Sequence, residues 1–195
     1  MLTSAHKLPG RSAGFSLLEM MIAMVVLAIL ITTGGPSFSA WLNNNQIRAG
    51  AEAMRTGLQL ARAEAVRRNT TVFFSLTSTA DNTCALSTSG GNWVVSLVSP
   101  AGYCANTPGT APAQIIQVRP STETRRAVIT SDVNQVSFNG FGRANVAVNL
   151  CVGIAADTGT CIGTEPEHRL KVQVSAAGQI KMCNASLDST DPQGC

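Results

Sequence analysis

The chain has 195 residues, 45% apolar and only 13% charged, a length that suits one domain with an appendage. Of its 14 basic residues, Lys7 and Arg11 lie at the extreme N-terminus, which leaves 12 basic against 11 acidic residues beyond them. Because the numbers of basic and acidic residues are nearly equal, the net charge gives no argument for a nucleic acid or an acidic partner.

The N-terminal segment combines a short basic leader with a long apolar run. Residues 1–14 form the leader, and the 21 residues from Phe15 to Gly35 contain one ionisable side chain, Glu19. As a helix, this run would reach about 30 Å, enough to cross a bilayer core. It is too long for the apolar part of a secretory signal peptide, and no A-x-A cleavage pattern follows it. We therefore expect a retained membrane helix, with Pro36 kinking it or opening it locally.

The region after Pro36 predicts an amphipathic helix that ends near Asn69. Its apolar positions recur at spacings of three and four residues, which places them on one helix face. These positions are Ile47, Ala51, Met54, Leu58, Ala61 and Ala65.

A different side of this helix carries Arg48, Arg55 and Arg62, seven residues apart. Glu52 is placed to pair with Arg48 and Arg55. The stripe is compatible with a nucleic-acid surface, but a solvated helix face with ion pairs is the favoured interpretation.

From Thr70 onward, short runs rich in Val, Ile and Phe predict strands, separated by clusters of turn-forming residues. The runs are residues 70–76, 92–98, 114–118, 134–139, 145–152, 169–175 and 179–183. The last two resemble a hairpin that turns at Ala177 and Gly178.

The expected fold class is α+β, with a protruding apolar half-helix and an amphipathic half packed on an antiparallel sheet. The expected regions are a leader (1–14), a transmembrane or filament-core helix (15–36), the amphipathic half-helix (37–69) and a disulfide-stabilised β-domain (70–195).

Six cysteines and an export-like N-terminus predict disulfides in an oxidising compartment. Fifteen connectivities are possible. Sequential pairing is favoured because each loop is then short and rich in turn residues. It gives the pairs Cys84–Cys104, Cys151–Cys161 and Cys183–Cys195. A zinc site is the alternative, but no CxxC pair or nearby histidine supports it.

The N-terminal motif resembles that of the type IV pilin superfamily, which includes the pseudopilins of type II secretion. The family carries a basic leader ending in glycine, then phenylalanine, then an apolar run with glutamate as its fifth residue. Here these residues are Gly14, Phe15 and Glu19, and Pro36 is the twenty-second residue counted from Phe15. The stretches at residues 44–72 and 136–183 are similar to the FimT/FimU minor pilins and to the pseudopilin GspH.

The resemblance implies that a prepilin peptidase cuts between Gly14 and Phe15 and that the new amine of Phe15 is methylated. The protein would wait in the inner membrane, with its globular part in the periplasm, and then join other major and minor pilins in a pilus at the cell surface. Glu19 would set the assembly register by meeting the Phe15 amine of a neighbouring subunit. This reading makes the chain a minor pilin that primes assembly or lies near the tip. A minor pseudopilin is one alternative.

A DNA receptor for natural transformation is the second alternative. Some FimT-like pilins bind DNA through a Gly-Arg-x-Arg motif, and Gly178-Gln179-Ile180-Lys181 lacks both arginines. Because phosphate contacts dominate DNA affinity, this departure weighs against DNA. Arg125, Arg126 or Arg143 remain candidates for a basic patch elsewhere.

An enzyme is not expected, and neither is a cofactor or a metal. Glu165, Glu167 and His168 offer possible metal ligands, but no second histidine follows at ligand spacing, so a solvated turn is favoured. No glycine-rich phosphate loop and no nucleophile elbow are found in the sequence.

Overall fold

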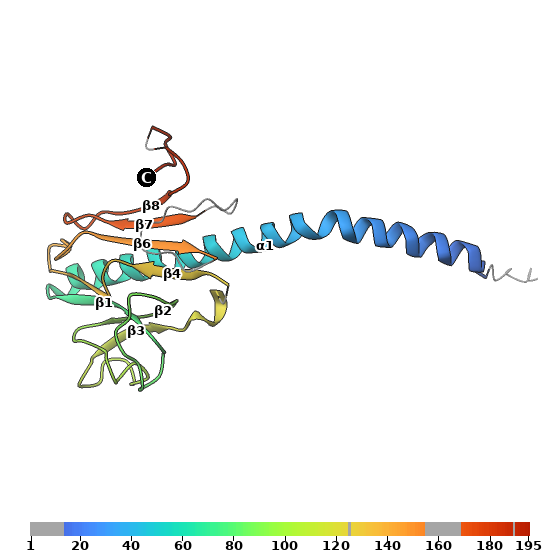
Figure 1. The fold of residues 1–195 in the computed structure, drawn as a ribbon. Helices are drawn as coiled ribbons and strands as arrows, with labels where there is room; N and C mark the ends of the chain where they lie inside the picture. The colour runs from blue at the N-terminus through green and yellow to red at the C-terminus, as the bar shows by residue number, and fades with distance from the viewer. Residues whose placement is uncertain (1–13, 125, 155–168, 189) are drawn as a thin grey trace, which may run out of the picture. The chain divides into compact units, whose positions relative to one another are not determined.

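The computed structural model describes residues 14–124, 126–154, 169–188 and 190–195, with the backbone alone at residues 32–37, 123 and 124 (Figure 1). Several residues named above therefore lie outside the described part: the leader up to residue 13, Arg125, Cys161 and the Glu165–His168 stretch. The chain divides into two units, Met1–Ser39 and Ala40–Cys195.

One helix, α1, spans Leu17–Arg68, and Pro36 lies within its bounds. The kink predicted at Pro36 stays a prediction. The sequence also predicts a membrane-crossing segment over residues 15–36. Within the described residues, however, no helix combines the length and the apolar character that crossing a membrane requires.

The C-terminal end of α1 is closed by a Schellman motif. Asn69 adopts a left-handed conformation with φ of 50°. Its N–H donates to the carbonyl of Val66, and the N–H of Thr70 donates to the carbonyl of Ala65. Asparagine tolerates this conformation, and the two bonds satisfy carbonyls that the helix leaves open. The helix therefore ends where the sequence predicts.

The apolar stripe of the second half of α1 is fully buried. Its six predicted members, Ile47, Ala51, Met54, Leu58, Ala61 and Ala65, each expose 1% or less of their surface. The expected ion pairs of Glu52 were wrong: among the described residues, neither Arg48 nor Arg55 forms a salt bridge with it, whereas Glu64 does pair with Arg67 and Arg68. Exposed pairs of long side chains gain little over hydration, so helical spacing alone does not secure them.

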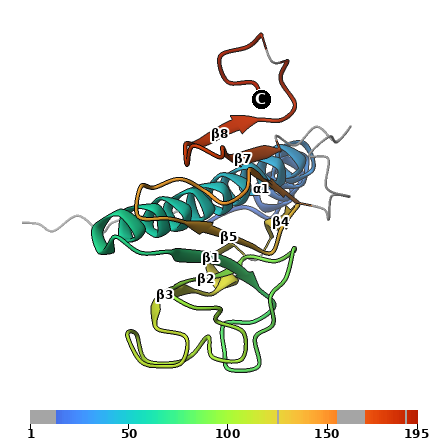
Figure 2. The ribbon, with the colours of Figure 1, turned by 90° about the vertical axis from the view of Figure 1, so that its left-hand side faces the viewer.

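Eight strands form two four-stranded antiparallel sheets in the unit that begins at Ala40. The first sheet has the order β3-β2-β1-β5, and the second has the order β4-β6-β7-β8. The strand bounds are β1 Val72–Thr77, β2 Asn92–Ser96, β3 Ile115–Arg119, β4 Val128–Ser131, β5 Gln135–Phe138, β6 Val148–Gly153, β7 Leu170–Val174 and β8 Ile180–Asn184, with a short 3-10 helix at Ser121–Thr124. Figure 2 shows the second half of α1 between β7 and β8 on one side and β1, β2 and β3 on the other.

The sequence patterns predict seven of these strands and miss β4. This strand has four residues and pairs with β6, Ile129 opposite Val152. Its run of β-branched residues is too short to show a period, so its partner decides its conformation. The predicted hairpin between β7 and β8 is present, and Gly178 supplies the positive φ (81°) that its turn requires.

The main core joins α1 to both sheets, and Gly57 allows the helix to approach closely. A Cβ at this position would lie 2.7 Å from Phe74 Cε2 and 3.0 Å from Trp93 Cζ2. Phe74 and Trp93 belong to the same core, with ring centroids 5.6 Å apart. A helix glycine normally costs stability, and here the loss is offset by the packing of two large aromatic side chains.

The opposite face of the first sheet carries a second, smaller core. Val94 and Ile115 pack there with Ala113 and with the Cys84–Cys104 disulfide. Trp93 and Val95 point into the main core and Val94 into the small one, as the alternation of a strand requires.

Disulfides hold the loops of this unit. Cys183 is bonded to Cys195 and thereby holds the C-terminal loop against β8. Cys151 is also disulfide-bonded, and its predicted partner, Cys161, lies outside the described residues.

Candidate assembly site

The start of α1 is fixed by Ser16. The N–H of Glu19 donates to Ser16 Oγ at 3.2 Å, and the N–H groups of Glu19 and Met20 donate to the Ser16 carbonyl at 3.1 and 3.2 Å. Ser-x-x-Glu is the sequence of a capping box, in which the first residue satisfies a free N–H of the first helical turn. Ser16 is thus the N-cap, and Glu19 is the third residue of the helix.

The predicted cleavage bond lies directly before this cap. Gly14 and Phe15 are exposed and precede the helix. A Cβ at Gly14 would meet no atom within 4 Å. Among the described residues, none packs against Gly14, and cleavage between Gly14 and Phe15 stays a prediction.

Glu19 is exposed in the first helical turn, where the helix dipole favours a negative charge. Within the described part of the chain, the other side chains of its helical segment up to Ile31 are apolar. The N-terminal end of the helix therefore stabilises the negative charge of the Glu19 carboxylate, although the side chains around Glu19 are hydrophobic.

The apolar side chains around Glu19 are exposed on all sides of the helix. They expose between 50% and 80% of their surface: Phe15, Leu17, Leu18, Met20, Met21, Ile22, Met24, Val25, Val26, Leu27, Ile29, Leu30 and Ile31. A helix that is apolar all round is normally buried by other molecules or by lipid. This segment therefore requires an environment that the single chain does not provide.

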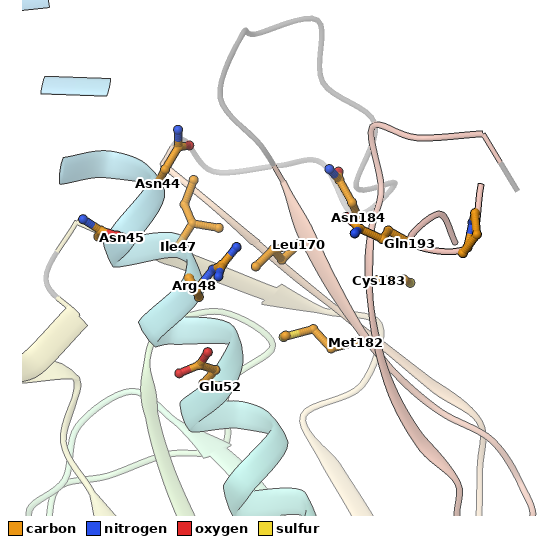
Figure 3. A pocket seen from close by; sticks show the side chains of 11 residues that line it. Asn44, Asn45, Ile47, Arg48, Glu52, Leu170, Met182, Cys183, Asn184 and Gln193 are labelled. Carbon is orange, nitrogen blue, oxygen red and sulfur yellow. The ribbon is translucent and has the colours of Figure 1, made fainter. Parts of the chain in front are cut away.

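A groove between α1 and the β8 end of the second sheet has a volume of about 690 Å³ (Figure 3). In Figure 3, Ile47 and Arg48 on α1 lie across from Leu170 and Met182. Glu52 and several amide side chains complete the lining. The described residues contain no cluster of three metal-ligating side chains.

Among the described residues, the basic side chains that the sequence singles out do not form one patch. Arg126 Nη1 donates to Asn43 Oδ1 at 3.4 Å, near the beginning of the second half of α1. Arg143 follows Gly142, whose carbonyl accepts a hydrogen bond from Arg62. Asn43 and Arg62 are 19 helical residues apart, which corresponds to about 28 Å along the axis.

Lys181 contributes little to such a patch. Its Nζ lies 3.4 Å from the carbonyl of Gly194 in the C-terminal loop. The structure therefore brings neither Arg126 and Arg143 together nor frees Lys181 from that loop.

Three charged side chains form an ion cluster at the end of α1. Arg67 Nη2 and Arg68 Nε contact Glu64 Oε2 at 2.7 and 2.6 Å. Hydrogen bonds from Arg67 and then Arg68 lower the pKa of Glu64 to about 2. Sequence reasoning missed this cluster, although the spacings of three and four residues could have indicated it.

An exposed apolar start of a long helix, a capped glutamate and a globular unit of antiparallel sheets on the same helix define a pilin-type protein. Residues 10–34 match the prokaryotic N-terminal methylation motif, and residues 50–178 match the family of the type II transport protein GspH. The chain belongs to the GspH family, and its proteins are structural and not enzymatic.

A solved crystal structure supports the fold. The type IV minor pilin FimU of Pseudomonas aeruginosa (strain PAO1) is similar in a crystal structure with a TM-score of 0.52 and 17% identity, over 80% of this chain and 98% of FimU. The solution structure of Escherichia coli GspH gives a TM-score of 0.44 and 15% identity, over 76% of this chain and 94% of GspH. No curated protein matches the chain in sequence.

The predicted fold class is thereby confirmed: an α+β pilin fold with a long N-terminal helix packed on antiparallel sheets. The methylation motif implies processing by a prepilin peptidase and assembly with other pilins. The family also implies anchoring in the inner membrane before assembly.

Proposed function

We propose that this protein is a minor type IV pilin that primes pilus assembly or lies at or near the pilus tip. The observation that carries the proposal is the exposed apolar segment Phe15–Ile31 with its capped carboxylate, Glu19. Such a segment serves an assembly in which other subunits cover it. The three predicted disulfides and the C-terminal cysteine loop favour a pilin over a pseudopilin.

Glu19 acts as the register mark of this assembly. A carboxylate within hydrocarbon costs about 2.5–3.5 kcal/mol on insertion scales, so such residues are usually paired. Cleavage after Gly14 creates a cationic amine on Phe15, and the Glu19 carboxylate of a neighbouring subunit neutralises it. Because only one axial register brings both charges together, the pair supplies specificity.

A minor pseudopilin of type II secretion is the second candidate, and the family match itself favours it. The apolar segment and Glu19 fit both assemblies equally well. The two candidates differ in the assembly that the subunit joins, which is a pilus for a minor pilin and a type II secretion system for a pseudopilin.

DNA capture is a weaker candidate. Arg126 and Arg143 are associated with opposite ends of the second half of α1, and Lys181 is engaged by the C-terminal loop. Since each phosphate contact adds to DNA affinity, scattered single cations bind weakly.

Deletion of the gene, with counts of surface pili, DNA uptake and protein secretion, tests the proposal. We expect a loss of pili that the intact gene restores, with secretion unchanged. Loss of secretion with normal pili would contradict the proposal and support the pseudopilin, whereas loss of DNA uptake with normal pili would support DNA capture.

A further inference from the structure

A tight turn at Asn139–Arg143, between β5 and β6, displays an aromatic side chain on a rigid base. Asn139 Oδ1 accepts hydrogen bonds from the N–H groups of Phe141 and Arg143 at 3.0 and 3.1 Å. The Asn139 N–H also donates to the Arg143 carbonyl at 3.0 Å, and the Gly142 N–H donates to the Asn139 carbonyl at 2.8 Å. Four backbone N–H groups of the turn, those of Asn139, Phe141, Gly142 and Arg143, therefore find acceptors within the turn itself.

Two distant segments hold this turn from outside. Arg62 Nε on α1 donates to the Gly142 carbonyl at 3.2 Å. Gly178, in the turn between β7 and β8, packs so closely that a Cβ there would overlap the Gly142 carbonyl. Gly140 packs in the same way against Asn69, the residue that ends α1. The conformation of the turn is thus determined by α1 and by the β7–β8 hairpin as well as by its own hydrogen bonds.

The side chain that this arrangement displays is Phe141, which exposes 86% of its surface. Val66 is also exposed, and its Cγ2 would lie 3.2 Å from a Cβ placed on Gly142. Phe141 and Val66 therefore border the same Gly142 backbone. Burial of an apolar side chain is favourable, so an exposed phenylalanine at the tip of a rigid turn can stabilise a complex with a partner.

The charges next to this turn are predominantly positive. Arg143 is exposed, and among the described residues neither it nor Arg62 forms a salt bridge. The last two turns of α1 add Arg67 and Arg68 against one carboxylate, Glu64.

We propose that Phe141, with Arg143 in the same turn and Val66 against Gly142, is the anchor by which this protein docks on the globular domain of a neighbouring subunit. The partner surface presents an apolar pocket with a carboxylate at its rim. Aromatic and arginine side chains dominate binding energy at the centre of protein interfaces. A rigid turn also loses little conformational entropy on binding. This inference rests on the proposed function, because it assumes that the protein joins a filament of pilin-type subunits.

A protein partner fits this surface better than DNA does. A base can stack on the exposed ring of Phe141, but Val66, which lies against Gly142, offers an aliphatic side chain that does not stack with bases. Among the described residues, the turn Asn139–Arg143 contains one cation, Arg143, while tight DNA binding requires many phosphate contacts.

The test uses the full chain in its own host. Sheared filaments and the membrane fraction are probed for the protein with Phe141 replaced. We expect Phe141→Ala to lower the ratio of filament to membrane protein by about tenfold or more, as truncation of a central aromatic anchor commonly does. Phe141→Leu should retain most of the incorporation, and Arg143→Glu should lower it.

The matched control is Tyr103→Ala, which removes another exposed aromatic side chain from a loop of the same unit and should change nothing. Protease resistance of each variant confirms that it folds. A photo-crosslinker at position 141 should give an adduct with another pilin-type subunit in the filament fraction. The cross-linked peptide should carry apolar residues and Asp or Glu.

Three results would overturn the inference. One is normal incorporation of Phe141→Ala in a strain whose pili depend on the gene. Another is a crosslink only to lipid. The third is that Phe141→Ala no longer retards DNA in a gel shift but is incorporated into filaments normally. This result would show that the turn binds nucleic acid. If gene deletion leaves pili intact, the proposed function fails instead, and that result is read independently of the variants.

Discussion

The two halves of α1 differ in whether their apolar side chains are exposed or buried. In the described residues up to Ile31, apolar side chains are exposed on every side, whereas from Ile47 to Ala65 they form one stripe that is almost completely buried. A stripe needs a partner on one side, and the two sheets of the same chain provide it. An apolar surface all round needs a surrounding partner, which must come from outside the chain. The pattern around a helix therefore indicates whether its partner is internal.

The largest expected effect comes from substitution of Glu19, in the exposed half of the helix. Glu19→Ala should reduce incorporation into filaments about tenfold or more, since a 1.4 kcal/mol loss already corresponds to a factor of ten. Processing at Gly14 and stability of the globular unit should stay unchanged. Immunoblots of sheared filaments against the membrane fraction measure the effect.

Glu52→Ala is the matched control, because it removes an exposed carboxylate from the second half of the same helix. It should incorporate normally. Normal incorporation of Glu19→Ala would exclude the register role.

Removal of the Cys84–Cys104 disulfide should destabilise the globular unit without affecting the N-terminal segment. We expect the double serine variant to lose about 2–4 kcal/mol in free energy of unfolding, the usual contribution of a native disulfide. Denaturant unfolding measures the loss.

The double serine variant of Cys183 and Cys195 tests whether a disulfide that closes a shorter loop contributes less to the free energy of unfolding. Its loop spans 12 residues instead of 20, and chain entropy alone makes its contribution about 0.5 kcal/mol smaller. Equal or larger destabilisation by the second variant would contradict this ranking.

Overpacking at Gly57 should cost somewhat less. Gly57→Val places new atoms against Phe74 and Trp93, so the free energy of unfolding should fall by about 1–3 kcal/mol. Thr56→Val places the same side chain at the neighbouring exposed position and should change stability by no more than about 0.5 kcal/mol. A loss for Gly57→Val no larger than for Thr56→Val would show that the packing around Gly57 relaxes to accept the side chain.

The smallest effect should come from Glu64. Its pKa is lowered from 4.5 to about 2 by hydrogen bonds from Arg67 and Arg68. Because the pKa of Glu64 is lower in the folded state than in the unfolded state, its ionised carboxylate stabilises the folded state fully above pH 4.5. This contribution is lost as the pH falls towards 2. Because Arg67 is largely exposed, Glu64→Gln should cost only about 0.2–1 kcal/mol at pH 7.

Denaturant unfolding of the parent and Glu64→Gln at pH 7 and near pH 2 checks the sign. The difference between the two proteins should shrink at the lower pH. A difference that grows would assign the stabilisation to another group.

Local patterns in the sequence predicted much of the fold. The spacing from Ile47 to Ala65 identified the buried face of α1, because a helix repeats every 3.6 residues whatever it packs against. Gly178 marked its hairpin turn, because few residues adopt a positive φ. The four residues of β4 escaped notice, since so short a run has no measurable period.

Non-local contacts account for what the sequence left open. It gave no signal that Gly178 would pack on Gly142, or that Arg62 would reach across to the same turn. It also suggested partners for Glu52 that the described structure does not contain, because exposed ion pairs depend on details of side-chain placement.

The sequence by itself thus determined the N-terminal motif of Gly14, Phe15 and Glu19, the helix face and most strands. All of these depend on residues close together in the chain. Only the tertiary structure decided the division of strands into two sheets, the separation of Arg126 from Arg143 and the display of Phe141. These depend on which distant segments meet, and that is settled by packing and burial over the whole globular unit.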